Sequence, residues 1–318
     1  MKIVVLDGYV LNPGDLSWDK LAQIGELKVY DRTIPEDVIA RIGDAEIIYT
    51  NKTVINETVI NACPNLKFIG VLATGYNVVD TVVAGEKNIV VTNIPDYGTN
   101  SVAQFTFGLI LELCHRIGLH SDSVKKGDWT NNTDFSYCLT PQIELQDKIL
   151  GIIGFGKIGK AVIKIAQAFG MKVIVSTAYP DEKYLSSNLK FVSQDELFRE
   201  ADIISLHCPL TSQNENMINN KTISVMKTGV IIINTARGGL IEERSLADGL
   251  ASGKIFGAAV DVVSQEPIKD TNPLLKAPNC LITPHIAWAP REARQRLMDI
   301  AVRNLEKYLD QTPINIVN

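Results

Sequence analysis

The segment ILGIIGFGKIGKAVIKIAQAFG, residues 149–170, joins an apolar strand pattern to an amphipathic helix pattern through a glycine-rich turn. Its glycines follow the spacing Gly154-x-Gly156-x-x-Gly159. The first suits a tight turn, the second lets a ligand approach the backbone, and the third lets the helix pack closely on the strand. The unpaired N–H groups and the positive dipole end of the new helix would then bind a pyrophosphate. The segment predicts the strand-turn-helix unit of a dinucleotide-binding domain.

Short apolar runs that read as strands recur on both sides of this segment. In the first hundred residues they are KIVVLDG, LKVYDR, AEIIYTN, LKFIGVLA and IVVTNIP. From residue 148 on they are KILGIIGFG, MKVIVST, ADIISLHCP, GVIIINTA, FGAAVDV and NCLITPH, separated by helical patterns such as 157–169 and 242–252. Continuous apolar runs are typical of strands that are covered on both faces. The sequence therefore predicts an α/β protein with two doubly wound parallel sheets.

The chain is long enough for two domains, because 318 residues exceed what one hydrophobic core usually organises. A long apolar helix pattern, NSVAQFTFGLILELCHRI, begins near Asn100 and separates the two series of strands. A last amphipathic helix pattern begins at Arg291, and we expect it to return to the first sheet. The predicted domains are residues 1–99 plus 289–318, and an inserted domain of residues 100–288.

Composition and charge exclude several classes of protein. Hydrophobic residues make up 46% and charged residues 21% of the chain, which is typical of a globular protein. A formal net charge of −5 gives no basic surface for nucleic acid or an anionic membrane. No apolar run approaches the roughly 18 residues of a membrane span. The five cysteines lie far apart without a CxxC pair, so we expect reduced thiols, no metal site and a cytoplasmic protein.

Three polar residues follow predicted strands of the second domain, at the sheet edge where ligands bind in such folds. They are Arg237 after GVIIINTA, Glu266 after FGAAVDV and His285 after CLITP. The forked guanidinium of an arginine can grip a carboxylate. An imidazole can exchange a proton with a carbonyl oxygen, and a carboxylate beside it fixes its tautomer and favours its protonated form. Each residue alone has an ordinary structural reading, but their joint placement predicts the reduction of a 2-keto acid.

Further residues are expected to contact ligands. Asp261 ends a strand, where it would accept a hydrogen bond from the carboxamide of the cofactor or, alternatively, cap a turn. In the first domain Ala73, Thr74 and Gly75 end a strand, and their successive N–H groups would form an anion-binding nest for the substrate carboxylate. Asn51 ends the preceding strand and is a further candidate for substrate binding.

These residues as a set resemble the D-isomer-specific 2-hydroxyacid dehydrogenase family. The similar stretches are GIIGFGKIG, SLHCPLTSQNENMIN, INTARGGLI, AAVDVVSQEP and ITPHIAWAP. With GVLATGYNVVD and NIPDYGTNSVAQFTFGLIL the resemblance covers nearly the whole chain. Within the family, ATGYNVVD and TPHIAWA are most similar to the glycerate dehydrogenase, or hydroxypyruvate reductase, branch.

The resemblance implies a flavodoxin-like substrate domain, an inserted Rossmann domain that binds NAD(H) or NADP(H), and a homodimer. It implies that Arg237 binds the substrate, that Glu266 tunes the histidine and that His285 does the acid/base work. Trp288 would line the substrate pocket, unless it is simply a packed aromatic residue. The implied cofactor contacts are Thr99, Gly154, Phe155, Gly156, Lys157, Ile158, Gly159, His207, Cys208, Pro209, Thr235, Ala236 and Asp261.

The residue expected to choose between the two cofactors departs from the family pattern. An acidic side chain that hydrogen-bonds the adenosine ribose is expected about 18–20 positions after the last glycine of the turn. That region holds Thr177, and the nearest cation is Lys183. A 2′-phosphate would meet no carboxylate there, so the sequence favours NADP(H) over NAD(H), with Thr177 at the cofactor.

The predicted activity is reversible hydride transfer between NAD(P)H and a small 2-keto acid such as hydroxypyruvate or glyoxylate. One alternative is a D-lactate-type dehydrogenase with a more apolar substrate. Another is a non-catalytic, dinucleotide-sensing protein similar to the co-repressors of this fold. Phosphoglycerate oxidation is disfavoured, because no basic cluster for a phosphate is evident.

Overall fold

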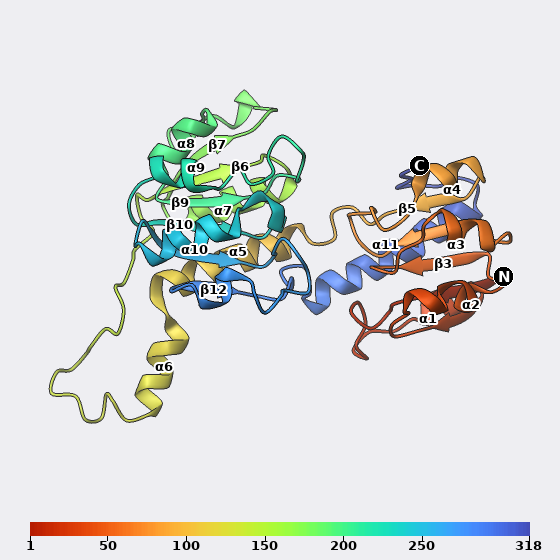
Figure 1. The fold of residues 1–318 in the computed structure, drawn as a ribbon, viewed down its shortest axis with the longest axis horizontal. Coiled ribbons are helices and arrows are strands. Elements are labelled where there is room, and N and C mark those ends of the chain that lie inside the picture. The colour runs from red at the N-terminus through yellow and green to blue at the C-terminus, as the bar shows by residue number, and fades with distance from the viewer. The chain divides into compact units, whose positions relative to one another are not determined.

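The computed structural model describes residues 1–318 and divides into two compact units (Figure 1). One unit is Met1–Gly98 with Ala289–Asn318, and the other is Thr99–Trp288. The division lies one residue before the predicted boundary, because the helix α5 (Thr99–His115) already begins at Thr99. Each unit is built on one parallel sheet with helices around it, which confirms the predicted fold class.

The first unit has a five-stranded parallel sheet in the order β2-β1-β3-β4-β5, which is the flavodoxin-like order. The strands are β1 (Lys2–Val5), β2 (Glu26–Val29), β3 (Ile47–Thr50), β4 (Phe68–Val71) and β5 (Val90–Thr92). One face packs against the helices α2 (Val38–Ile42), α3 (Glu57–Ala62) and α4 (Thr81–Glu86), and the 3₁₀ turn η1 (Pro35–Asp37) leads into α2. The other face is covered by α1 (Asp19–Ala22) and α11 (Arg291–Leu309).

The C-terminal helix α11 returns to the first sheet, as the sequence predicts. The ring of Tyr308 lies 5.1 Å from that of Phe68, centroid to centroid. The hydroxyl of Tyr49 donates a 2.9 Å hydrogen bond to the carbonyl oxygen of Ala301, and burial raises the pKa of this phenol. A Cβ atom at Gly70 would lie 2.3 Å from the Tyr49 ring, so only glycine leaves room for this contact.

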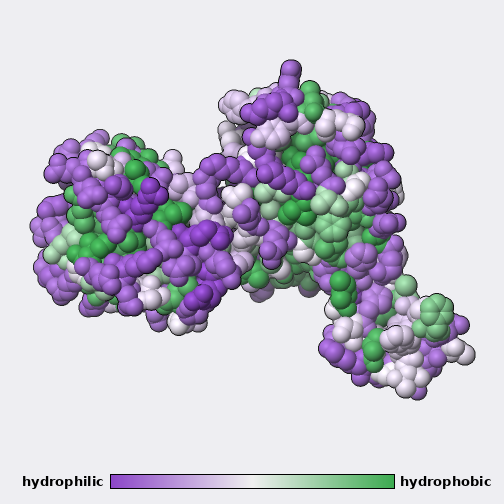
Figure 2. Space-filling model, turned by 180° about the vertical axis from the view of Figure 1, so that it is seen from behind, coloured by the Kyte–Doolittle hydropathy of each residue, from purple (hydrophilic) through white to green (hydrophobic).

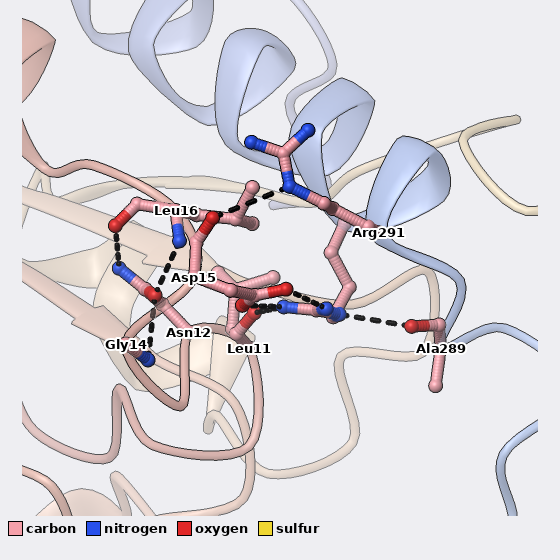
Figure 3. Close-up of polar contacts among 8 residues, drawn as sticks. Leu11, Asn12, Gly14, Asp15, Leu16, Ala289 and Arg291 are labelled. Carbon is pink, nitrogen blue, oxygen red and sulfur yellow. Dashed lines mark hydrogen bonds and ion pairs between the residues drawn. The ribbon is translucent and has the colours of Figure 1, made fainter.

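The loop after β1 is fastened to the start of α11 (Figure 3). Arg294 donates two hydrogen bonds, both 2.7 Å long, to the carboxylate of Asp15, and this pairing lowers the pKa of the Asp15 carboxyl group. Arg294 also donates to the carbonyl oxygens of Leu11 and Ala289, at 2.9 and 2.8 Å. The Nε atom of Arg291 donates to the carbonyl oxygen of Asp15 at 3.3 Å. The chain that leaves the second unit is therefore held as soon as it enters the first.

The second unit has a seven-stranded parallel sheet in the order β12-β11-β10-β9-β6-β7-β8, a Rossmann arrangement with one strand added. The strands are β6 (Ile149–Ile153), β7 (Lys172–Ser176), β8 (Leu189–Phe191), β9 (Ile203–Leu206), β10 (Val230–Asn234), β11 (Ile255–Val260) and β12 (Cys280–Ile282). The strand β8 is not among the predicted strands, because only Leu189 of its three residues is buried and no apolar run marks it.

Helices cover both faces of this sheet. One apolar layer packs α5 and α7 (Lys157–Ala168) on the strands, and the other packs α8 (Gln194–Glu200), α9 (Asn220–Val225) and α10 (Glu243–Ala251). The 3₁₀ turns are η2 (Glu182–Tyr184), η3 (Gly238–Leu240) and η4 (Pro273–Lys276). Because all strands run parallel, the turns that follow β6, β9, β10, β11 and β12 meet at one edge of the sheet.

The helix α6 (Ile117–Lys125) follows α5 across Arg116 and projects from the second unit (Figure 1). Residues 126–148 continue from it without helix or strand. No single helix is long and apolar enough to cross a membrane. The pair α5 and α6 has that length and composition, but it is bent by 53° and most apolar side chains of α5 lie in the core.

Candidate active site

The glycine-rich turn has the geometry that the spacing predicts. Gly154 has a φ of +104°, a region that other residues avoid, and a Cβ atom there would lie 2.5 Å from the carbonyl oxygen of His207. A Cβ atom at Gly159 would lie 2.3 Å from the carbonyl oxygen of Gly154. At Gly156 a Cβ atom would meet nothing within 4 Å, so the backbone there is open to a ligand. Gly154 and Gly159 thus allow close packing of the backbone, and Gly156 leaves space for a ligand.

The N-terminus of α7 fits the pyrophosphate of a dinucleotide. The N-cap residue is Gly156, and no side chain caps the first turn. Helix N-termini of this kind present N–H groups and a positive dipole end to an anion. Phe155 lies just before the cap, and Lys157 and Ile158 open the helix. The arrangement supplies local attraction for an anion on a chain whose net charge is −5.

The loop after β9 lies directly against this turn, since the backbone of His207 and Cys208 comes closest to Gly154. Although part of His207 remains accessible, its imidazole lies among protein atoms, and burial lowers its pKa to about 4. Its Nε2 atom is 2.8 Å from the Ser205 hydroxyl. Burial also raises the pKa of the Cys208 thiol. A neutral imidazole and a protonated thiol therefore flank the turn, and Pro209 follows them on the surface.

The end of β7 carries no acidic side chain where the ribose is expected. The hydroxyl of Thr177 accepts a 3.2 Å hydrogen bond from the N–H of Tyr179. Lys183, the cation noted in the sequence, is 2.8 Å from Asp181, and this hydrogen-bonded pairing lowers the pKa of Asp181 and raises that of Lys183. The local surroundings of Thr177 thus combine a neutral hydroxyl with a cation that already has a carboxylate partner.

Arg237 is held by a turn that Asn234 shapes at the end of β10. The fully buried Asn234 accepts a hydrogen bond from the N–H of Ala236 at 3.0 Å and donates one to the carbonyl oxygen of Arg237 at 2.8 Å. The hydroxyl of Thr235, the residue after Asn234, lies 3.2 Å from the hydroxyl of Thr106 on α5. The guanidinium of Arg237 is exposed and donates only to the carbonyl oxygen of Ala236, at 2.7 Å. Most of its donors are therefore available to a ligand.

Glu266 and His285 come together as the sequence predicts. The Nδ1 atom of His285 lies 2.7 Å from Oε2 of Glu266, and each side chain is about one third exposed, at 35% and 37%. A carboxylate at this distance is an acceptor, so Nδ1 carries the proton. The Nε2 atom of His285 has no partner within the chain and is the nitrogen that a ligand would meet.

Asp261 holds the turn that carries His285. Its carboxylate accepts hydrogen bonds from the Thr283 hydroxyl at 2.6 Å and from the N–H groups of Ile286 and Ala287, both at 2.9 Å. His285 itself has a φ of +55°, which non-glycine residues seldom adopt, so the turn needs such support. Within the chain, Asp261 therefore acts as the turn cap that the sequence analysis gave as the alternative to a cofactor contact. Asp261 is 1% exposed, so its carboxylate is enclosed by the turn that it caps.

Trp288 and Thr99 lie at the ends of the second unit. The indole N–H of Trp288 donates a 2.8 Å hydrogen bond to the carbonyl oxygen of His285. The hydroxyl of Ser101 on α5 donates to the carbonyl oxygen of Ala287 at 2.6 Å. Thr99 is the first residue of α5. The start of α5 is thus tied to the turn of His285 and Trp288.

The candidate substrate residues of the first unit lie at the carboxyl ends of β3 and β4. The side-chain amide of the buried Asn51 already donates to the carbonyl oxygen of Leu72 at 2.9 Å, so it serves the fold. The N–H groups of Ala73, Thr74 and Gly75 donate to no acceptor within the chain. These successive free donors fit the predicted anion-binding nest.

Sequence reasoning missed the residues that shape these turns. Asp7, directly after β1, accepts hydrogen bonds from the N–H groups of Asn51, Lys52 and Thr53 at 2.7, 2.6 and 2.8 Å. Asn234 shapes the arginine turn in a similar way. The available signal was a polar residue that ends an apolar strand run, since such side chains commonly bond nearby backbone groups. No group of three or more His, Cys, Asp or Glu side chains is arranged to hold a metal ion.

Comparison with known proteins agrees with this geometry. The family model for the NAD binding domain of D-isomer specific 2-hydroxyacid dehydrogenases matches residues 107–287. The hydroxypyruvate reductase of Blautia hydrogenotrophica is 56% identical over 321 residues, with 100% of both chains covered. The glycerate dehydrogenase of Methylorubrum extorquens is 40% identical over 295 residues, with 92% of both chains covered.

Solved structures share the whole fold. The TT0316 protein of Thermus thermophilus superposes with a TM-score of 0.88 at 33% identity, with both chains covered completely. The resemblance that the sequence motifs indicated is thereby confirmed, and with it an oxidoreductase that uses a nicotinamide dinucleotide. The chain belongs to the D-isomer specific 2-hydroxyacid dehydrogenase family.

Proposed function

We propose that the protein reduces hydroxypyruvate or glyoxylate to the corresponding 2-hydroxy acid with NAD(P)H, and that hydroxypyruvate is the preferred substrate of the two. The observation that carries the proposal is the 2.7 Å contact between His285 and Glu266, which leaves Nε2 of the imidazole free at the edge of the sheet that also carries Arg237. The identity to a hydroxypyruvate reductase along the whole chain supports the choice of substrate.

The chemistry follows from these three side chains. The exposed guanidinium of Arg237 binds the substrate carboxylate through two parallel hydrogen bonds and polarises the adjacent carbonyl group. His285 donates the proton on Nε2 to the carbonyl oxygen, and Glu266 stabilises the imidazolium before that transfer and orients the ring after it. When bound, the nicotinamide supplies the hydride that reduces the carbonyl carbon.

We also propose which residues hold the ligands. In the first unit the proposed substrate contacts are the free N–H groups of Ala73, Thr74 and Gly75, with Asn51 supporting their loop. In the second unit the proposed substrate contact besides Arg237 is Trp288. In the second unit the pyrophosphate lies on the start of α7, and the remaining cofactor contacts come from the turns around it. Those contacts are Thr99, Gly154 to Gly159, Thr177, His207, Cys208, Pro209, Thr235, Ala236 and Asp261.

The proposed substrate is tested by the loss of NAD(P)H absorbance with hydroxypyruvate, glyoxylate, pyruvate and a bulky apolar 2-keto acid. Arg237 can bind the carboxylate of any 2-keto acid and does not distinguish the four substrates. We expect the largest kcat/KM with hydroxypyruvate, because this small polar substrate suits the exposed, polar strand ends that carry Arg237 and His285. A larger kcat/KM with pyruvate would favour a D-lactate-type enzyme. No turnover with any of the four would favour a dinucleotide-sensing binding protein.

A preference for NADP(H) is expected from the residues at the end of β7. Thr177 presents no carboxylate to a 2′-phosphate, so kcat/KM with NADPH should exceed that with NADH, though only by about 3–10-fold, since Lys183 is already paired with Asp181. Replacement of Thr177 by aspartate should reverse the preference, because it restores an acceptor for the ribose hydroxyl. The same replacement at Thr228, which is exposed in the turn before β10, is the control and should leave the ratio unchanged. A strong preference of the unmodified protein for NADH would contradict the proposal.

We propose further that the protein is a homodimer of the cytoplasm, where its five free thiols would stay reduced. Figure 2 shows apolar surface on the projecting segment formed by α6 and the loop after it. The exposed apolar side chains of this segment are Ile117, Leu119, Val124, Trp129, Phe135 and Leu139, and Phe135 is 91% exposed. Surface of this kind commonly marks an interface.

Light scattering after size-exclusion chromatography should therefore give the mass of two chains. Replacing both Ile117 and Phe135 by serine should shift the mass toward one chain, because it removes apolar surface from the proposed interface. Replacing the exposed Val82 of α4 by serine is the control and should leave the mass unchanged. A single-chain mass for the unmodified protein would refute the dimer.

A further inference from the structure

Glu266 is carried by an exposed loop, residues 264–272, between β11 and β12. Residues 264 to 267 of this loop are all exposed, so no buried apolar side chain next to Glu266 fixes its position. The 2.7 Å contact of Glu266 with His285 nevertheless requires a loop that is held to within a fraction of an ångström, because a hydrogen bond weakens steeply with distance and angle. Val263 and Leu274 pack on the core on either side of the loop, so polar contacts are what hold the residues between them.

The polar anchor of these residues is the carboxylate of Glu243, the first residue of α10. Its Oε1 atom accepts a 2.7 Å hydrogen bond from the N–H of Ser264. Its Oε2 atom accepts from the Ser264 hydroxyl at 2.9 Å and from the amide of Asn272 at 3.0 Å. Ser264 and Asn272 are the first and last residues of the loop, so one carboxylate joins both of its ends to the helix.

The same end of the loop touches the backbone beside Arg237. A Cβ atom at Gly238 would lie 1.9 Å from the carbonyl carbon of Val263, so these two backbone segments are in direct contact. The N–H of Val263 points toward Oε1 of Glu266 at 3.3 Å. On the other side of the pair, the turn of His285 is fixed separately by Asp261. The Glu266–His285 contact therefore depends on two independent supports.

We propose that Glu243 is a positioning residue for proton transfer: by anchoring residues 264–272 it keeps Glu266 in register with His285. This inference rests on the proposed acid/base role of His285. Glu243 touches neither Glu266 nor His285, and it acts only through the loop. A misplacement of about 1 Å caused by a mutation away from the reacting atoms can cost about 10²-fold in rate.

Replacement of Glu243 by alanine should lower kcat with hydroxypyruvate by about 10–100-fold, while the Kd of NADPH and the thermal unfolding midpoint stay close to those of the unmodified protein. Glu243→Gln keeps one carbonyl oxygen for Ser264 and should recover part of the rate. Asp248→Ala is the matched control, because it removes a carboxylate of the same helix whose only partner is Arg244, 3.4 Å away on that helix. The control should retain full kcat.

A double-mutant cycle separates positioning from general support of the fold. In a Glu266→Gln background the further change Glu243→Ala should cost less than about threefold, because the group that it positions is already gone. A full rate for Glu243→Ala, or an equal loss in both backgrounds, would overturn the inference.

Hydrogen exchange provides a readout that does not depend on turnover. Amide exchange in residues 264–272 should accelerate in Glu243→Ala and not in Asp248→Ala. Unchanged exchange would refute the anchor even if the enzyme is active. The unmodified protein could reduce none of the keto acids while Glu243→Ala still accelerates exchange in the loop. In that case the anchor stands and the proposed function is wrong.

Discussion

Replacing His285 by glutamine is expected to lower kcat for hydroxypyruvate reduction by ~10²–10⁴-fold, the usual contribution of a positioned acid or base. Glutamine can still accept or donate a hydrogen bond, but it cannot transfer the proton that the carbonyl oxygen needs. The imidazole is about one third exposed and its hydrogen-bond partner is Glu266, so the fold should tolerate the change. Steady-state rates at saturating NADPH measure the effect.

Cofactor binding separates this loss from a general defect. Fluorescence titration with NADPH should give nearly the same Kd for His285→Gln as for the unmodified protein, because the proposed phosphate site is at α7. His120→Gln is the control, since His120 bonds only within the α6 region, at Arg116 and Leu139, and its rate should not change. Turnover within a few-fold of normal for His285→Gln would refute the assignment.

Replacing Arg237 by lysine is expected to raise KM for hydroxypyruvate by about 10–100-fold. The guanidinium grips a carboxylate through two parallel hydrogen bonds, and a lysine ammonium is a point charge that cannot form this pair. Losing one hydrogen bond to a charged group costs about 1.5–3 kcal/mol, and every 1.4 kcal/mol corresponds to about tenfold in affinity. Initial-rate measurements over a range of keto-acid concentrations give the KM.

The thermal stability of Arg237→Lys tests whether Arg237 also supports the fold. Its guanidinium donates only to Ala236 in the absence of ligand, so the change should leave thermal stability nearly unaltered. Arg244→Lys, on the exposed face of α10, is the matched control and should not change KM. An unchanged KM for Arg237→Lys would exclude substrate binding as the role of this residue.

The sequence was sufficient to predict most of the fold. Buried strands such as β10, with five consecutive buried residues, leave an unmistakable apolar run, and the glycine spacing marks the turn at α7. The three-residue strand β8 was missed, because Lys190 is exposed and Phe191 is only half-buried. Its parallel pairing with β7 defines this strand, and an apolar run does not. The domain boundary at Thr99 depended on where a helix begins, which sequence patterns define only to within a residue or two.

The contact between Glu266 and His285 was predicted, and the residues that support it were missed. Glu266 and His285 could be paired from their strand ends alone, because parallel strands deliver their carboxyl ends to one edge. Glu243 could not be recognised, since it binds a loop that is remote in sequence. Asn234 and Asp7 were marked only by their place at the end of an apolar run, which does not say which backbone groups they bind. Asp261 shows the same limit, because the sequence indicated a cofactor contact and left a turn cap as the alternative, and the contacts within the chain are those of the cap.

The central claim is that Arg237 and His285 act on one substrate molecule, and a crystal structure with the cofactor and the unreactive keto-acid analogue oxamate tests it most directly. The claim predicts the oxamate carboxylate on the guanidinium of Arg237 and the analogue's carbonyl oxygen within about 2.6–3.2 Å of Nε2 of His285. Oxamate bound away from either side chain, or a His285 ring turned so that Nε2 faces Glu266, would contradict it.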